Sequence, residues 1–226
     1  YQGVFFNWGS LWGLASAPND GESLDWGHNV NVYAPGGVQT TYDDWATWPR
    51  VEEAITIYNV PEGKEHRDRA YLYEVTDLTG STGIGDICRY LTEKGTNGLL
   101  HGRKWRMPTS NEFTELKVDN PTISFANLPL TSAKEPSGKR TLDYGLTSEE
   151  NVFFPNSGYR GNTNGALRNI SLEGYYWSST PSQNNYLNAC ALNFYKHSKD
   201  GPKVTDHYTI AQRKSGFSVR CVVDKK

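Results

Sequence analysis

The stretch GRKWRMPTSNEFTEL at residues 102–116 marks the start of a helix, and the rest of the chain can be laid out around it. Thr109 and Glu112 have the spacing of a capping box, in which the Thr109 hydroxyl accepts from the amide of Glu112 and the Glu112 carboxylate reaches back. Pro108 precedes the cap, and Phe113 lies where a hydrophobic staple would meet it. The local pattern therefore predicts a well-capped helix that begins at Thr109.

Two helices are predicted in the middle of the chain. The first covers 83–95, with Asp86 as the N-cap and Gly95 just past the last turn. Ile87 and Leu91 fall on one face of this helix. The second follows the capping box and extends to residue 118.

Strands are predicted at the N-terminus and throughout the last third of the chain. The segment 3–11 places Val4, Phe6 and Trp8 on one face and Phe5 and Asn7 on the other, like a strand with both faces partly covered. Five later segments are also predicted to be strands: 151–160, 174–180, 188–196, 204–212 and 216–224. Because the strands are segregated from the two helices, we expect an α+β fold with mixed or antiparallel sheets and long loops.

The region 15–80 has many turn-forming residues and neither helical nor strand periodicity. It is too long for a simple loop and too poor in pattern for a core of its own. We interpret it as a long irregular insertion in a single domain that spans 1–226.

Composition narrows the classes of function. The chain has 226 residues, of which 36% are hydrophobic, and a formal net charge of −2. Nucleic-acid binding usually requires a clustered basic face, so we expect no nucleic-acid partner. No run of apolar residues is long enough for a transmembrane helix.

The sequence offers no catalytic or metal-binding constellation. The five histidines are scattered, and neither a zinc-binding HExxH motif nor a calcium loop occurs. The glycine-rich 80–86 lacks the Lys-Ser/Thr ending of a phosphate loop. The acidic pair at 149–150 is adjacent in sequence, which on a strand places the two side chains on opposite faces. We therefore expect no metal and no cofactor.

Four motifs occur in a recognisable order: WRMPTSNEFTEL, FFPNSGYR, GYYWSST and SGFSVRCV. Over 83–224 they resemble the Fibrobacter succinogenes major paralogous domain family. The opening segment 3–11 resembles versions of that domain in surface and fimbria-associated proteins of gut bacteria. The resemblance implies a C-type-lectin-like fold, with a distant similarity to formylglycine-generating enzymes. Those enzymes carry a helix start like 106–112, so we expect this segment to be scaffold, with Arg106 tied to a carbonyl or carboxylate.

The resemblance implies a non-enzymatic module for adhesion or ligand binding at a bacterial cell surface or fimbria. It implies an extracellular location, anchored to the outer membrane, with a glycan, a host or bacterial surface protein, or fimbrial subunits as partners. One alternative is an enzyme related to the formylglycine-generating group, which uses two neighbouring cysteines that Cys190 alone does not supply. A purely structural surface subunit is the other. The lectin calcium loop is also missing, since Glu135-Pro136-Ser137 is the nearest match.

Two loops rich in Asn, Tyr and Gly, at 158–169 and 181–188, are the candidate ligand-binding surface. Their side chains suit hydrogen bonding and stacking to a glycan, or docking of a protein. The alternative that they simply turn between strands stays open. The candidate ligand-binding residues are Tyr159, Arg160, Asn162, Asn164, Arg168 and Tyr186.

Three cysteines allow at most one intrachain disulfide. In C-type-lectin-like folds a disulfide commonly joins the first helix to the last strand, so the resemblance implies Cys88–Cys221 and leaves Cys190 a buried thiol. A Cys190–Cys221 pair and fully reduced cysteines are the alternatives. The same fold implies that the first strand pairs with the last, which brings the termini together.

Overall fold

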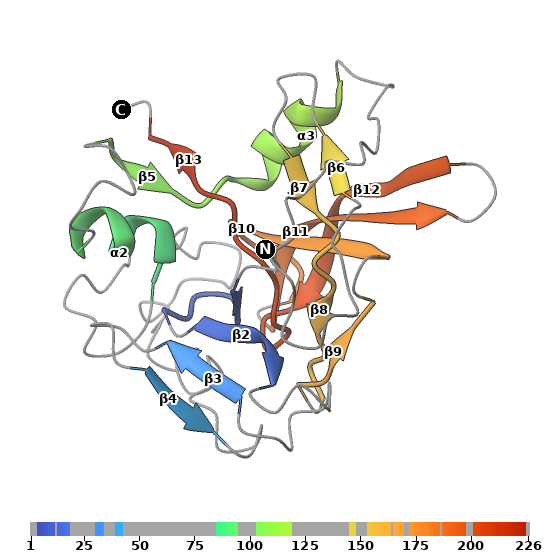
Figure 1. The fold of residues 1–226 in the computed structure, drawn as a ribbon. Helices are drawn as coiled ribbons and strands as arrows, with labels where there is room; N and C mark the ends of the chain where they lie inside the picture. Colours follow the sequence, from blue (N-terminus) through green and yellow to red (C-terminus); the bar gives the residue numbers. More distant parts are fainter. Residues whose placement is uncertain are drawn as a thin grey trace.

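The computed structural model combines two helices with several small antiparallel sheets (Figure 1). It describes residues 4–11, 13–18, 30–33, 39–42, 85–94, 103–118, 145–147, 153–163, 165–169, 172–185, 187–197 and 201–224. Apart from one two-residue strand between the helices, helices and antiparallel strands occupy separate stretches of these residues, which is compatible with the α+β prediction.

The helices are α2 (Ile87–Lys94) and α3 (Ser110–Val118). The strands are β1 (Phe5–Phe6), β2 (Gly13–Pro18), β3 (Val30–Tyr33), β4 (Gln39–Tyr42), β5 (Trp105–Arg106), β6 (Gly145–Thr147), β7 (Phe153–Pro155), β8 (Tyr159–Arg160), β9 (Leu167–Arg168), β10 (Glu173–Pro181), β11 (Asn188–His197), β12 (Gly201–Gln212) and β13 (Val222–Val223).

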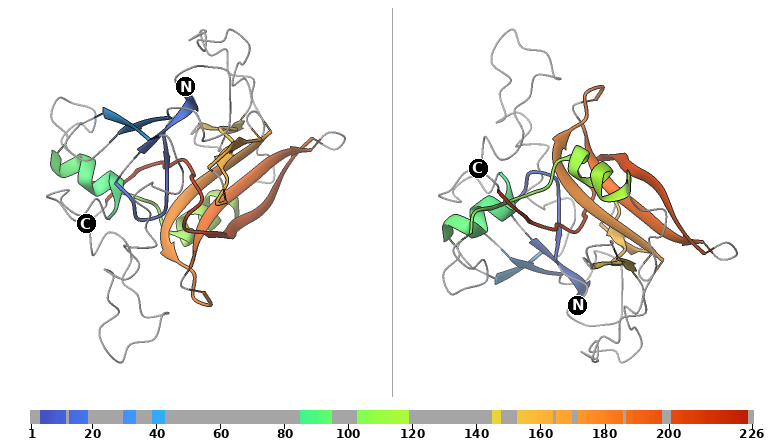
Figure 2. Two further views of the ribbon diagram at one scale, coloured as in Figure 1. Left: turned by 90° about the horizontal axis from the view of Figure 1, so that it is seen from below. Right: turned by 90° about the horizontal axis from the view of Figure 1, so that it is seen from above.

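The longest strands, β10, β11 and β12, form one antiparallel sheet in that order. In Figure 1, α3 lies above this sheet, whereas β8 and β9 lie below it. The two views of Figure 2 show the β11–β12 hairpin projecting away from α2 and the β1–β4 sheet. The sequence predicted all three of these strands to within a few residues.

The main core forms where this sheet meets the N-terminal segment and α2. Trp177 of β10 is fully buried and lies opposite Ala191 of β11 in the register of the sheet. Trp8 and Leu11 from the N-terminus pack into the same cluster, together with Ile87 of α2. Burial of each large apolar side chain stabilises the fold by about 1.5–3 kcal/mol, so this junction holds the distant parts of the chain together.

The first strand pairs with the C-terminal segment, as predicted. The Phe6 amide donates to the Phe217 carbonyl at 2.8 Å, and the Phe217 amide donates back at 3.0 Å. The predicted strand 216–224 is nevertheless not continuous. Its first part bridges to β1, β8 and β10, whereas β13 pairs with β5, because each part finds its backbone partner on a different element. The termini themselves, 1–3 and 225–226, lie outside the described residues.

The predicted strand 151–160 is also divided, into β7 and β8. Gly158 stands between them with a φ of 71°, a conformation that glycine adopts without steric cost. The Gly158 amide donates to the Glu173 carbonyl at 2.8 Å, which turns the chain onto the edge of β10. The turn is what separates the two strands.

Part of the region 15–80 is more regular than the sequence suggested. The strands β2, β3 and β4 pair in order with β1 in a four-stranded antiparallel sheet. Strands β3 and β4 have only four residues each, too few to display an alternating pattern. The remainder of the region lies outside the described residues, and the prediction of one domain over 1–226 stays a prediction.

The buried face of α2 differs in one position from the prediction. Ile87, Cys88 and Tyr90 are each less than a tenth exposed, whereas Leu91 is 43% exposed. Leu91 therefore lies at the margin of the helix face that Ile87 buries. Neither described helix is long and apolar enough to cross a membrane.

A disulfide joins Cys88 of α2 to Cys221, which directly precedes β13. The two Cα atoms are 5.6 Å apart, and the cysteines are separated by 133 positions in sequence. Cys190 is a buried free thiol. The pairing implied by the family resemblance is thereby confirmed, and the Cys190–Cys221 alternative is wrong.

Candidate functional site

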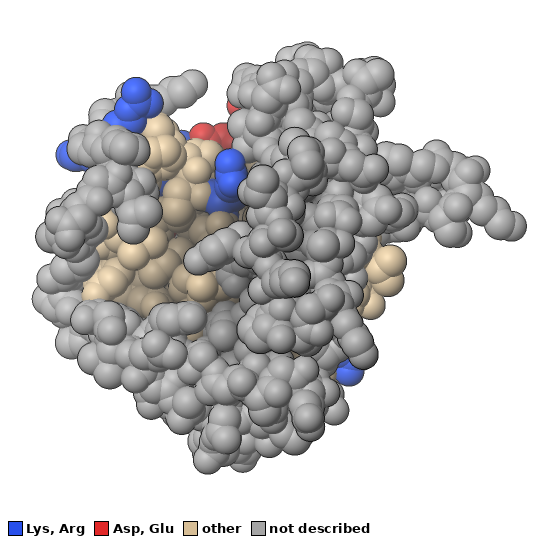
Figure 3. All heavy atoms as spheres, viewed as in Figure 1, with Lys and Arg blue, Asp and Glu red and all other residues tan. Residues whose placement is uncertain are grey.

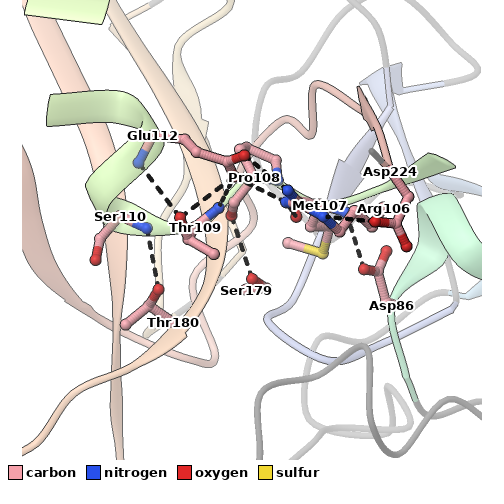
Figure 4. Close-up of polar contacts among 10 residues, drawn as sticks. All are labelled: Asp86, Arg106, Met107, Pro108, Thr109, Ser110, Glu112, Ser179, Thr180 and Asp224. Atoms are coloured by element: carbon pink, nitrogen blue, oxygen red, sulfur yellow. Dashed lines mark hydrogen bonds and ion pairs between the residues drawn. The ribbon is translucent and has the colours of Figure 1, made fainter. Parts of the chain in front are cut away.

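The WRMPT segment is tied into the fold by its arginine (Figure 4). Arg106 donates to both carboxylate oxygens of Glu112, at 2.8 and 2.7 Å, and to the Met107 carbonyl at 3.1 Å. Its Nε also lies 3.7 Å from the carboxylate of Asp224, next to β13. The prediction that Arg106 binds a carbonyl or carboxylate is confirmed, because it binds both kinds of group.

The capping box forms as predicted. The Glu112 carboxylate accepts from the Thr109 amide at 2.8 Å, and the Glu112 amide donates to the Thr109 hydroxyl at 3.3 Å. The hydrogen bond from Arg106 is the main cause that lowers the pKa of Glu112. Glu112 therefore stays ionised while it fixes both the helix start and the preceding strand.

A buried carboxylate fixes the other side of the segment. Asp86 is fully buried, and its Oδ1 accepts from the amides of Cys88 at 2.8 Å and Arg89 at 3.3 Å, which caps α2 as predicted. Its Oδ2 accepts from the Met107 amide at 2.8 Å. Burial raises the pKa of Asp86 to about 6, although the Met107 hydrogen bond favours the ionised form. Asp86 thus links α2 to the WRMPT segment.

These contacts make the segment a scaffold element. On the face shown in Figure 3, Lys, Arg, Asp and Glu atoms of the described residues lie close together in the upper left, where Figure 1 places β5 and β13. The exposed side chains of Arg103 and Lys104 precede β5. The hydrogen bonds of Arg106, Glu112 and Asp86 described above are internal, so these side chains do not form a ligand surface.

The candidate loop 158–169 forms a short hairpin. In the register of β8 and β9, Tyr159 lies opposite Arg168 and Arg160 lies opposite Leu167. The hairpin is held to the C-terminal segment because Arg160 and Gly216 exchange backbone hydrogen bonds of 2.8 and 2.9 Å. The loop at its tip closes through the Gly161 amide, which donates to the Ala166 carbonyl at 2.9 Å.

Arg160 does not belong to the ligand-binding surface, which corrects the prediction. Its side chain is 1% exposed, and Nη1 donates to the Gly165 carbonyl at 2.9 Å inside the hairpin loop. Burial lowers the pKa of Arg160 to about 10. Adjacent strand positions point to opposite faces, so Tyr159 reaches outward while Arg160 points inward and supports the loop from beneath.

The other predicted ligand-binding residues differ in how far their side chains are exposed. Arg168 is exposed, and Tyr159 and Asn162 are half-buried. The side-chain amide of Asn162 donates to the side-chain oxygen of Gln212 at the end of β12. Asn164 and Tyr186 lie outside the described residues, so their part in a ligand site stays a prediction.

The second candidate loop lies beside the first. Gln212, which contacts Asn162, pairs with Asn188 at the start of β11. The following residue, Arg213, donates from its amide to the Leu187 carbonyl at 2.9 Å. We call these neighbouring loops the hairpin surface, whose exposed or half-buried side chains are Asn162, Thr163, Arg168, Gln183, Asn184, Asn185, Leu187 and Gln212.

A buried arginine anchors the second loop to the core. The guanidinium of Arg213 lies 4.0 Å from the centre of the Trp8 ring, and its Nε donates to the Asn188 carbonyl at 3.0 Å. A cation over an aromatic face is stabilised when it is shielded from water. Arg160 and Arg213 therefore support the two loops from inside the fold.

Sequence reasoning missed a row of aromatic side chains next to the hairpin. We call it the aromatic ladder: Trp177, Phe217, Tyr175 and Tyr159. Ring centres are 4.2 Å apart between Trp177 and Phe217, 4.7 Å between Phe217 and Tyr175, and 4.9 Å between Tyr175 and Tyr159. Trp177 and Phe217 are buried, whereas both tyrosines are half-buried, so the ladder leads from the core to the surface.

Two polar side chains flank the outer tyrosines. The hydroxyl of Tyr175 lies near the side chains of Glu173 and Asn193, and its pKa is raised mainly by burial and then by Glu173. Glu173 is two residues before Tyr175 on β10, and Asn193 lies opposite Tyr175 on β11. The sequence predicted a strand at 174–180, but the cross-strand partner of Tyr175 required the register of the sheet.

The groups on the hairpin surface and at the outer end of the aromatic ladder suit hydrogen bonding and stacking. Within the described part of the chain, no group of three or more His, Cys, Asp and Glu side chains could hold a metal ion. Amides, a guanidinium, a carboxylate and two aromatic rings are present instead. Such groups can hydrogen-bond and stack against a ligand.

Comparison with known proteins adds no relative to this description. No protein-family model, no curated protein and no solved structure matches the chain. The resemblance of the four motifs to the Fibrobacter succinogenes major paralogous domain family therefore stays a prediction.

Proposed function

We propose that this chain is a non-enzymatic module of C-type-lectin-like fold that binds a glycan or a protein at a bacterial cell surface or fimbria. The observation that carries the proposal is the contact between Asn162 and Gln212, which joins loops far apart in sequence. It places amide, guanidinium and hydroxyl groups side by side on the hairpin surface. Recognition sites are commonly built in this way, from loops held on a rigid scaffold.

Two features of the scaffold support a binding role. The buried arginines Arg160 and Arg213 hold the loops in place, so little conformational entropy is lost when a ligand binds. The disulfide between Cys88 and Cys221 is typical of proteins in oxidising compartments, which supports an extracellular location. The outer-membrane anchor is part of the proposal on the family resemblance alone.

The rival enzymatic function has less support. Cys221 is committed to a disulfide, and Cys190 is 6% exposed. Burial raises the pKa of the Cys190 thiol to about 11, whereas a nucleophilic cysteine requires a lowered pKa and access to its substrate. A purely structural surface subunit is the other competing function. The binding experiment described next separates it from a ligand-binding module.

The experiment is a glycan array run beside a pull-down with purified fimbrial subunits and surface proteins. The wild-type chain is compared with a variant of the hairpin surface, Arg168→Ala together with Gln183→Ala. Arg103→Ala is the matched control, since Arg103 is also exposed but precedes β5. Binding that the hairpin variant loses and the control keeps supports the proposal. A wild-type chain that binds nothing contradicts it and favours the structural subunit.

A further inference from the structure

We propose that the outer end of the aromatic ladder, Tyr159 and Tyr175 with Glu173 and Asn193, is a subsite for one pyranose ring of a carbohydrate. This inference rests on the proposed function and narrows its ligand to a sugar. The subsite lies at the base of the β8–β9 hairpin, next to the main sheet, rather than at the loop tips.

The two rings are held in place before any ligand arrives. Tyr159 meets Tyr175 edge-on, with an angle of 64° between the ring planes, and meets Phe217 at 88°. Tyr175 in turn lies over Phe217, which stacks on the fully buried Trp177. Because each ring is fixed by the next, binding at the outer end requires little ordering of side chains.

Polar groups stand beside these rings at fixed positions. The Glu173 carboxylate and the Asn193 side chain both lie near the Tyr175 hydroxyl, because Asn193 is the cross-strand partner of Tyr175 and Glu173 is two residues before it on the same strand. The Asn193 amide also donates to the Gly174 carbonyl at 3.4 Å. A carboxylate accepts hydrogen bonds, and an amide both donates and accepts, so the pair suits the vicinal hydroxyls of a sugar.

The combination of aromatic rings with a carboxylate and an amide favours a sugar over other ligands. A pyranose presents an apolar C–H face to an aromatic ring and a rim of hydroxyls to neighbouring polar groups. Arg168 lies opposite Tyr159 in the hairpin register and is exposed, which adds a donor at the edge of the subsite. A purely apolar peptide would displace water from the charged Glu173 carboxylate without replacing its hydrogen bonds, which is costly.

The test titrates the purified chain with methyl pyranosides and with β-linked oligosaccharides of glucose, galactose and N-acetylglucosamine. Binding is followed by isothermal calorimetry and by the tyrosine ring signals in NMR spectra. We expect Tyr159→Ala and Glu173→Gln each to weaken binding by about tenfold or more. Glu115→Gln, an exposed position on α3, is the matched control and should leave the affinity unchanged.

A folding control keeps the result interpretable. Near-UV circular dichroism and the melting temperature identify any variant that loses structure. If Tyr159→Ala does not fold, Glu173→Gln still tests the subsite, because glutamine keeps the shape of the glutamate side chain. Saccharide binding that both folded variants retain overturns the subsite and leaves the proposed function standing. A wild-type chain that binds a protein but no saccharide overturns the sugar inference alone. A chain that binds neither contradicts the proposed function as well.

Discussion

Removing the disulfide is expected to cost this fold more stability than any single surface change. The variant replaces Cys88 and Cys221 by alanine, because Cys88 is fully buried and alanine introduces no hydroxyl there. The bond closes a loop with a sequence separation of 133. In the chain-entropy model, opening a loop of that length lowers the free energy of unfolding by about 5 kcal/mol, as an upper value.

That loss is large against the total stability of a domain, which is typically about 5–15 kcal/mol. The bond also joins α2 to the segment that leads into β13, so its removal loosens both ends of the WRMPT scaffold. Cys190→Ala is the matched control, since Cys190 is a buried thiol outside the disulfide. Its cost is limited to the small cavity that it leaves, about 1 kcal/mol.

Urea unfolding with and without dithiothreitol measures the effect, after a non-reducing peptide map has established the bond. We expect the reducing agent to lower the unfolding midpoint of the wild type and of Cys190→Ala, and to leave the double variant unchanged. An identical wild-type midpoint with and without dithiothreitol would refute the reasoning. A cross-linked peptide that contains Cys190 would refute the pairing, and free thiols at all three positions would weaken the surface-protein proposal as well.

Three further predictions concern the scaffold. The pKa of Asp86 is about 6 in the fold against an ordinary value of 3.8, so its stabilising effect is present below pH 3.8 and is lost as the pH rises through 6. The stability difference between wild type and Asp86→Asn should therefore fall by about 2 kcal/mol from pH 4 to pH 7 in urea titrations; a constant difference would contradict this sign. Arg106→Lys loses the bidentate hydrogen bond to Glu112 and should lower the free energy of unfolding by about 1–2 kcal/mol. In a double-mutant cycle with Glu112→Gln the two changes should be strongly coupled, and additive effects would contradict this prediction. Deleting residues 1–11 removes the bridge to the C-terminal segment and several buried side chains, so no cooperative melt should remain by calorimetry.

What the sequence predicted correctly was local. The capping box of Thr109 and Glu112 and the N-cap Asp86 depend on residues within one helical turn, and the structure contains both caps. The long strands β10, β11 and β12 were predicted because each contains a long run of strand-forming residues. The disulfide came from the family resemblance, since spacing alone left three outcomes open.

What the sequence missed depends on contacts between distant segments. An arginine in a loop rich in Gly and Asn is typical of an exposed position, yet Arg160 is buried because β8 lies against Gly216. The role of Tyr175 became visible only with the strand register that brings Asn193 beside it. The strands β3 and β4 are too short to show a pattern without their partners.

The measurement that tests the central claim most directly is a hydrogen–deuterium exchange footprint. The free chain is compared with the chain saturated with the ligand that the array or the pull-down identifies. The account predicts slower exchange at 158–169, 173–176 and 182–188, with no change at 103–112, which is scaffold. Protection of 103–112 alone, with the hairpin surface and the outer end of the aromatic ladder unchanged, would contradict it.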